Sequence, residues 1–218
     1  MPTPTATLLP PAARLPELPP SAPRRGHPRW LRALGRWVMT GLGWRYVGGF
    51  PDVPRMVLIG APHTSNLDGL VGLAAAAGGD LSFAVFAKRQ LFWGPVGWAL
   101  RAFGGVPVDR SAPGGLVEQG VERLRGPEPA IVAITPEGTR SAVARWKSGF
   151  HRIAVEAGVP IAVVGIDWGR REIRICGTLE PTGDLGADLE TIEGLLAGVE
   201  GRHPARATAP TAGRAVAA

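Results

Sequence analysis

Apolar and polar residues alternate in two different rhythms between residues 56 and 199 of the chain. Short apolar runs rich in Val and Ile are typical of strands, and apolar residues spaced three or four apart are typical of helices. The first pattern predicts strands at 56–61, 81–87, 105–108, 130–135, 160–166 and 172–176. The second predicts helices near 65–77, 91–103, 116–124, 148–157 and 185–199.

The regular alternation of strands and helices predicts an α/β fold, with a layered, largely parallel or mixed sheet flanked by helices. The 218 residues suffice for one such domain. Residues 1–28 hold nine of the 22 prolines and few large apolar side chains, which predicts a disordered, Pro-rich tail. We expect the folded domain at 29–200, followed by a second disordered tail at 201–218.

The segment 29–47 differs from both neighbours because aromatic and basic residues share a helical spacing. Two interpretations are open: a basic amphipathic helix that lies on a membrane, or a helix that packs on the domain. Several glycines weaken the prediction of a helix. The apolar positions are Trp30, Leu34, Trp37, Val38 and Gly41, and the basic ones are Arg29, Arg32 and Arg36.

Charge and cysteine content narrow the class of protein. Residues 1–55 hold eight Arg against Glu17 and Asp52, so they carry the whole net charge of +6. The neutral remainder argues against nucleic-acid binding, whereas the basic segment suits an anionic membrane surface. A single cysteine, Cys176, excludes an internal disulfide and a cysteine-built zinc site. No apolar run approaches the ~20 residues of a spanning helix, and no signal peptide precedes the domain, so we expect a cytosolic protein.

The first candidate for chemistry is His63, which follows the strand 56–61 and precedes a predicted helix. Open α/β sheets bind ligands at the carboxyl ends of their strands. If Asp68 lies in the first turn of the helix, its carboxylate can orient the imidazole and leave the second nitrogen as a base. The alternative is purely structural, because Ser65 and Asp68 also fit a helix-capping box.

Two further loops follow predicted strands. Residues 135–141 combine a glycine with Arg140, which suits a phosphate or carboxylate, although an ordinary turn with an exposed Arg has the same composition. Residues 108–111 offer Arg110 next to Asp109, and a solvated ion pair is the simpler interpretation.

Other reactive or aromatic side chains receive structural interpretations. Cys176 lies in an alternating strand and is a poor nucleophile candidate. His27 and His203 fall in the predicted tails, and His151 is expected on a solvated helix face. Three tryptophans could line a groove for an apolar ligand, but core or interface packing is the favoured interpretation. They are Trp93, Trp98 and Trp146.

The order and spacing of these pieces resemble the glycerolipid acyltransferase family, which includes lysophosphatidate and glycerol-3-phosphate acyltransferases. The resemblance covers roughly residues 56–166. One departure is Val163, where the family commonly has a second proline. The matching blocks are His63-x4-Asp68, Lys88-x-x-Leu91-Phe92-x-x-Pro95-x-Gly97, Gly105 to Arg110, Pro136 to Arg140, Lys147-x-Gly149-Phe150 and Gly158 to Ile161.

The resemblance implies an α/β acyltransferase that moves a fatty acyl group from acyl-CoA or acyl carrier protein to a hydroxyl, without a metal or another cofactor. It implies His63 as general base and Asp68 as its orienting partner. Backbone amides at the helix start near Ser65 are candidate donors to the oxyanion. The residues implied to bind the phosphate of the acceptor are Lys88, Arg110, Glu137, Gly138, Thr139 and Arg140.

Three functions stay open at this point. The first is transfer to a lysophospholipid, above all 1-acyl-glycerol-3-phosphate, by an enzyme attached peripherally to the inner face of the cell membrane. The second is the same chemistry on another amphiphile, such as a lyso-ornithine lipid or a glycolipid precursor. The third is a lipid- or nucleic-acid-binding module without catalysis, which would have no need of an oriented base.

Overall fold

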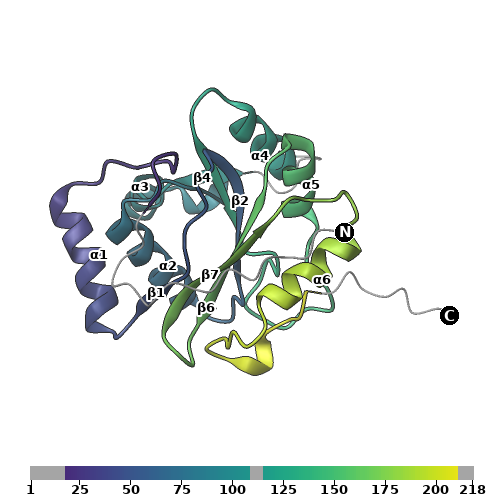
Figure 1. Cartoon of the computed structure of the whole chain (residues 1–218). Coiled ribbons are helices and arrows are strands. Elements are labelled where there is room, and N and C mark those ends of the chain that lie inside the picture. Colours follow the sequence, from purple (N-terminus) through teal and green to yellow (C-terminus); the bar gives the residue numbers. More distant parts are fainter. Residues whose placement is uncertain (1–17, 109–114, 211–218) are drawn as a thin grey trace.

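A twisted sheet runs through the centre of the molecule, with helices on both of its faces (Figure 1). The computed structural model describes residues 18–108 and 115–210. Among these residues the strand order in the sheet is β1-β7-β6-β2-β5-β3-β4. The strands are β1 Arg45–Val47, β2 Arg55–Ala61, β3 Ala84–Lys88, β4 Gly105–Val108, β5 Ala130–Ile134, β6 Ile161–Asp167 and β7 Glu172–Leu179.

Neighbouring strands are parallel except for β6 and β7, which pair antiparallel. The predicted fold class, a layered and mostly parallel sheet with flanking helices, is therefore confirmed. Because β2, β5 and β3 run in the same direction, the segments that follow them emerge at one edge of the sheet. This edge brings together two of the segments to which the sequence assigned chemistry, the one that carries His63 and the loop at 135–141.

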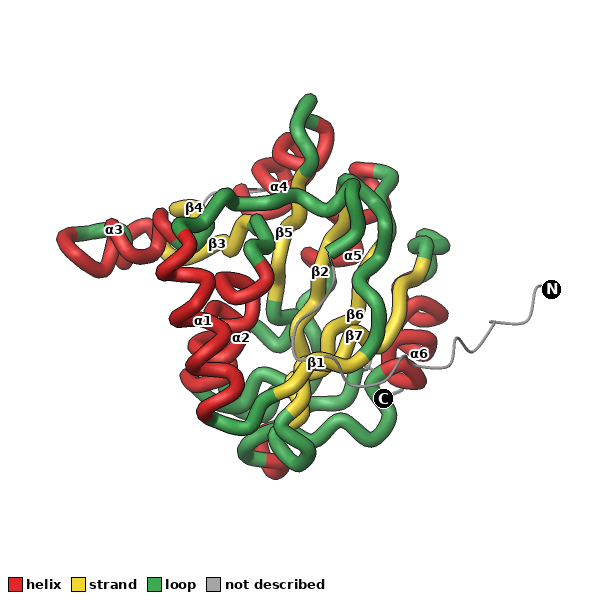
Figure 2. The backbone as a smooth tube through the Cα atoms, turned by 60° about the vertical axis from the view of Figure 1, so that its left-hand side comes forward, coloured by secondary structure: helices red, strands yellow, loops and turns green. Residues whose placement is uncertain are grey.

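The helices cover the sheet unequally. In Figure 1, α1 and α2 lie on one side of the sheet and α4, α5 and α6 on the other, while Figure 2 shows α3 extending outward beside β4. The predicted helices are found with shifts of a few residues at their ends. The bounds are α1 Arg29–Gly41, α2 Asn66–Gly79, α3 Gly94–Ala102, α4 Gly115–Arg125, α5 Gly149–Ala157 and α6 Leu185–Leu195, with short 3-10 helices at Arg89–Leu91 and Pro204–Arg206.

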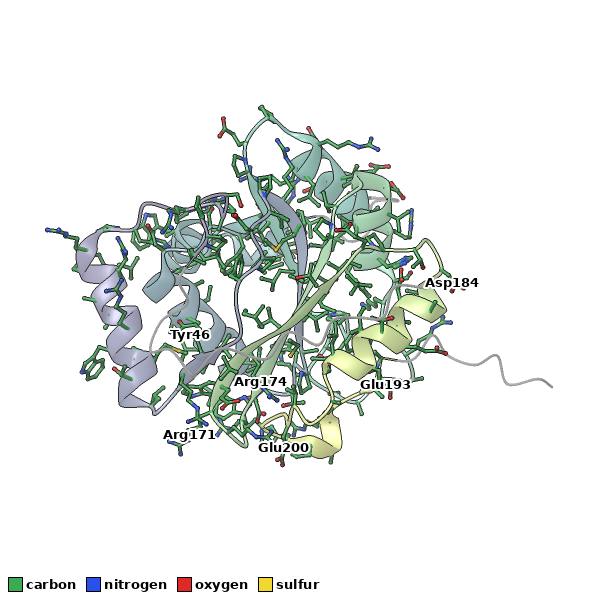
Figure 3. The ribbon with its side chains drawn as sticks, in the orientation of Figure 1. Tyr46, Arg171, Arg174, Asp184, Glu193 and Glu200 are labelled. Carbon is green, nitrogen blue, oxygen red and sulfur yellow. The ribbon has the colours of Figure 1, made fainter. Side chains whose placement is uncertain are left out.

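Burial is deepest in the middle strands. All seven residues of β6 are buried, as expected for a parallel strand covered on both faces. The larger apolar cluster joins β2 and β6 to α4, α5 and α6, and a smaller one joins the sheet to α1 and α2. Tyr46 belongs to the smaller cluster, and its hydroxyl donates to the Ala75 carbonyl of α2 at 2.8 Å (Figure 3).

The prediction of a disordered tail up to residue 28 is wrong for residues 18–28. Ala22 is buried, Arg24 forms a bridge with Leu81, and the Ser21 amide donates to Asp52 at 3.2 Å. A proline-rich segment cannot form a core of its own. It can still order on an existing surface, since proline loses less chain entropy than other residues. The residues before 18 lie outside the described part of the chain.

The second predicted tail also differs, as far as residue 210. The Thr208 carbonyl accepts from the Trp146 indole at 3.0 Å, and the Thr208 hydroxyl accepts from the Val143 amide at 3.0 Å. These long-range hydrogen bonds order a segment that has no apolar periodicity. Strand β1 was not predicted either, because three residues give too short a pattern and depend on pairing with β7.

Candidate active site

His63 and Asp68 meet where β2 passes into α2. His63 follows the end of β2 by two residues, and Asp68 lies in the first turn of α2. His63 Nδ1 lies 3.3 Å from Asp68 Oδ2, and their side chains are 15% and 0% exposed. The distance suits an ion pair, but its angle misses that of a hydrogen bond, so Nδ1 has no hydrogen-bond partner among the described residues. Such bonds are often long in unliganded enzymes.

Asp68 also serves as part of the helix cap. Its Oδ2 accepts from the amides of Thr64 and Ser65, each at 2.7 Å, and the Ser65 hydroxyl accepts from the Leu67 amide at 3.2 Å. The capping box is therefore complete. The two interpretations of this motif are compatible, because one carboxylate both caps α2 and faces the imidazole.

The second oxygen of Asp68 is held from another part of the chain. Its Oδ1 accepts from the indole N–H of Trp168 at 2.7 Å. Burial by itself would raise the pKa of Asp68, but the contact with His63 and the donors at Ser65, Trp168 and Thr64 together lower it. Asp68 is thus an ionised carboxylate throughout the neutral range.

Glu137 lies just beyond β5, the strand next to β2, and is only 2% exposed. Its Oε2 accepts from the His63 amide at 2.7 Å, which fixes the main chain at the candidate base. Burial raises its pKa to about 7, although the hydrogen bond from the His63 amide opposes that rise. Glu137 was expected to bind the acceptor; in the structure its side chain is enclosed and bonded to the His63 main chain, and its role toward the acceptor stays a prediction.

Replacing Glu137 with Gln should flatten the pH dependence of stability. A carboxyl with a pKa raised from 4.5 to about 7 keeps a proton that the unfolded chain has already lost, so the fold weakens as pH rises through this window. The neutral amide escapes that loss, which is on the order of 3 kcal/mol for a shift of this size. Thermal unfolding of both proteins at about pH 4 and pH 8 measures the difference. Parallel curves would contradict the raised pKa.

Gly138, in the loop after β5, lies toward the same site. Gly138 has φ +66°, which favours glycine, and a Cβ there would lie 2.9 Å from Lys147 Cε. Thr139 and Arg140 are exposed, and Arg140 has no hydrogen-bond or ion-pair partner among the described residues. Arg110 and the side chain of Lys88 lie outside the described part of the structure, so their predicted roles stay predictions.

A cavity of about 1400 Å³ opens at His63 and Asp68. Its walls come mainly from α2 and from the central strands, and they are largely apolar. Leu73, Phe86 and Leu100 are typical of this lining. Three cations also line it: Arg145, Lys147 and Arg152. The cavity thus combines a histidine with its carboxylate neighbour, largely apolar walls and three cationic side chains.

Other residues singled out in the sequence lie away from this chemistry. His151 is buried rather than solvated, because α6 covers it and Asp188 pairs with its Nε2 at 2.7 Å. Trp93 and Trp98 are 84% and 74% exposed, so core packing is wrong for them, whereas it holds for Trp146. Burial raises the pKa of the Cys176 thiol, which makes a thiolate nucleophile less accessible.

The sequence did not predict a place in the site for Lys147 or Trp168. Lys147 stood in a matching block without a role, and its position beside Gly138 was not predictable without the loop conformation. Trp168 gave no signal at all, since 100 residues separate it from Asp68. Across residues 18–108 and 115–210, no three His, Cys, Asp or Glu side chains gather closely enough to hold a metal ion.

Comparison with known proteins decides the family. The family model described as Acyltransferase matches residues 49–167, more than half of the chain. The chain belongs to the acyltransferase family. Its fold is similar to the crystal structure of the 1-acyl-sn-glycerophosphate acyltransferase PlsC from Thermotoga maritima, with a TM-score of 0.52 and 22% identity over 78% of this chain and 76% of that one. No curated protein matches the chain.

As a member of this family, the chain takes an acyl donor and an acceptor in general terms. The matched segment contains His63, Asp68, Glu137 and the loop around Gly138. It ends at the last residue of β6, one position before Trp168.

Proposed function

We propose that this acyltransferase moves a fatty acyl group from a thioester, acyl-CoA or acyl carrier protein, to the hydroxyl of a lysophospholipid, above all 1-acyl-glycerol-3-phosphate. The observation that carries the proposal is His63, which faces the cavity with Asp68 3.3 Å from its Nδ1. Because Nδ1 faces the carboxylate, Nε2 is the nitrogen left for substrate.

The proposed reaction uses His63 as a general base. The acceptor hydroxyl oxygen attacks the thioester carbonyl carbon while Nε2 takes the hydroxyl proton. The tetrahedral intermediate then releases the thiolate, which receives that proton and leaves as a thiol. An ester bond forms and the carbon–sulfur bond breaks, with no cofactor in the balance. Asp68 stabilises the imidazolium that forms between the two steps.

The start of α2 is a weaker candidate for the oxyanion site than its sequence suggested. The amides of Thr64 and Ser65 already donate to Asp68, and the Leu67 amide donates to Ser65. Donors engaged in the cap cannot also meet the developing charge without breaking it. The cap therefore orients the carboxylate, and the oxyanion needs another donor.

The cations near the cavity support an anionic acceptor. Arg140 is exposed and unpaired among the described residues, and Lys147 reaches over Gly138 on the same loop. A planar guanidinium can grip a phosphate in bidentate fashion. The apolar walls around Leu73 and Phe86 suit a fatty acyl chain. We therefore place the phosphate at the loop and the acyl chain beneath α2.

One assay tests this function. The purified protein is incubated with a labelled acyl thioester and a panel of acceptors, and the products are read by mass. We expect diacylglycerol phosphate from 1-acyl-glycerol-3-phosphate and little product from the same acceptor without its phosphate. Equal transfer to neutral and anionic acceptors would move the preference to another amphiphile. No transfer to any acceptor would contradict the proposal.

We also propose that α1 docks the enzyme on an anionic membrane. The helix packs on α2 through Gly35 and Met39, while Trp30, Leu34 and Trp37 are 67%, 47% and 71% exposed. One face of the helix therefore packs on the domain, and the exposed face is the one we propose for membrane docking. Arg29 and Arg36 are exposed next to the aromatic face. None of the helices described in the structure is long and apolar enough to span a bilayer.

A double variant, Trp30→Ser with Trp37→Ser, should lower binding to anionic vesicles at least tenfold, because tenfold corresponds to only about 1.4 kcal/mol and a fully buried apolar side chain contributes roughly 1.5–3 kcal/mol. Substitution is sharper than deletion, because removing α1 would uncover the face of α2 that Met39 packs on. Sedimentation with vesicles at low and high salt measures the binding.

The matched control for this prediction is Val155→Ser, an exposed apolar position on α5 across the sheet. It should leave vesicle binding unchanged. Unaltered sedimentation of the double variant would place the docking surface elsewhere. Equal binding to neutral vesicles at both salt concentrations would remove the electrostatic part of the proposal.

A further inference from the structure

Trp168 reaches the candidate site from outside the segment that the family model matches. It directly follows β6, and its indole N–H donates to Asp68 Oδ1 at 2.7 Å. Asp68 Oδ2 already accepts from Thr64 and Ser65 and faces His63. The two oxygens of the carboxylate are therefore held from two different directions.

The indole itself is held firmly in place. The Trp44 and Trp168 rings form a T-shaped pair, with their planes at 90° and their centres 5.0 Å apart. Two further contacts hold Trp168. The Arg202 guanidinium carbon lies 5.0 Å from the centre of the Trp168 ring, and the Trp168 amide donates to the Glu200 carbonyl at 2.8 Å. Figure 3 shows Glu200 in the segment that follows α6. An aromatic ring with contacts on this many sides has little freedom to rotate.

The same segment after α6 also packs behind the loop that carries His63. The His203 amide donates to the Thr64 hydroxyl at 3.2 Å, and Thr64 is fully buried. Gly201 lies so close to this loop that a Cβ on it would be 3.0 Å from Pro62 Cγ and from Thr64 Cγ2. Residues 200–203 therefore contact both Trp168 and the loop between β2 and α2.

We propose that Trp168 is a positioning residue of the acyl transfer: its indole N–H, backed by residues 200–203, fixes the rotation of the Asp68 carboxylate so that Oδ2 faces His63. The inference rests on the proposed role of His63 as base. A carboxylate anchored at Oδ2 alone can turn about its Cβ–Cγ bond, and the imidazole then loses its orientation. Anchoring at both oxygens removes this freedom before substrate arrives.

Trp168→Phe tests the proposal, because it removes the donor and keeps most of the ring. We expect kcat to fall about tenfold, with the Michaelis constants of acceptor and donor unchanged, since the base is disoriented but the binding surfaces are intact. The matched control is Trp98→Phe, the same substitution at a 74% exposed ring away from this site. It should keep kcat within twofold.

A second variant covers the case in which Trp168→Phe does not fold. Gly201→Ala presses on Pro62 and Thr64 from the other side of the loop and should lower kcat several-fold, again without raising either Michaelis constant. Wild-type kcat in a folded Trp168→Phe enzyme would overturn the inference, as would an equal loss of kcat in Trp98→Phe. His63→Ala separates the two ideas: if it is inactive while Trp168→Phe is fully active, only the positioning role fails, and if it is active, the base itself is wrong.

Discussion

An enzyme with His63 replaced by alanine should lose about a hundredfold to ten-thousandfold in kcat and keep its melting temperature. Removing a general base costs this much in comparable proton transfers. The fold should tolerate the change, because the imidazole Nδ1 has no hydrogen-bond partner among the described residues and the main-chain amide keeps its bond to Glu137. Steady-state kinetics and thermal unfolding of the same preparation measure both quantities.

The chain supplies its own control in a second histidine–carboxylate pair. His151 Nε2 lies 2.7 Å from Asp188 Oδ2, buried between α5 and α6 on the opposite side of the sheet from α2 (Figure 1). His151→Ala leaves part of a buried carboxylate without its partner and should lower stability by about 2 kcal/mol. Its kcat should stay near that of the wild type. An active His63→Ala enzyme would exclude the proposed base, whatever the control shows.

The contrast between these histidines shows what sequence can reveal. His63 was recognisable because its partner Asp68 lies five residues away, within one strand-to-helix connection. The burial of His151 depends on α6, which begins more than 30 residues later, so its own helix pattern predicted a solvated position. Local pairs can be predicted from spacing, whereas pairs made by packing of distant elements cannot.

Glu137 illustrates the same limit within the site. Its place after a predicted strand was correct, but the sequence could not show that β5 lies next to β2. That adjacency turns the carboxylate toward the His63 amide. The predicted tails show the same limit. Residues 18–28 and 201–210 are ordered only by contacts with distant elements, which their own sequence does not reveal. The buried strands, by contrast, carry their own signal in runs of Val and Ile.

Replacing Asp68 with Asn should lower both activity and stability. An amide has only one oxygen, and the amides of Thr64 and Ser65 require it in the place of Oδ2. The NH2 group then faces the Trp168 indole N–H, and two donors oppose each other. With the imidazolium no longer stabilised, we expect kcat to fall about a hundredfold or more. The unpaired indole should cost about 2 kcal/mol in unfolding free energy.

The pH dependence separates this account from a simple loss of helix capping. The pKa of Asp68 is lowered in the fold, so its ionised form contributes stability above its usual range near 3.8, and that contribution disappears as pH falls through the folded pKa. The stability gap between wild type and Asp68→Asn should therefore be widest at neutral pH and close in strong acid. A variant with full kcat and reduced stability would leave Asp68 with the cap alone. Full stability with reduced kcat would instead mean that the introduced amide caps α2 as well as the carboxylate does, and that only the charge facing His63 is needed for transfer.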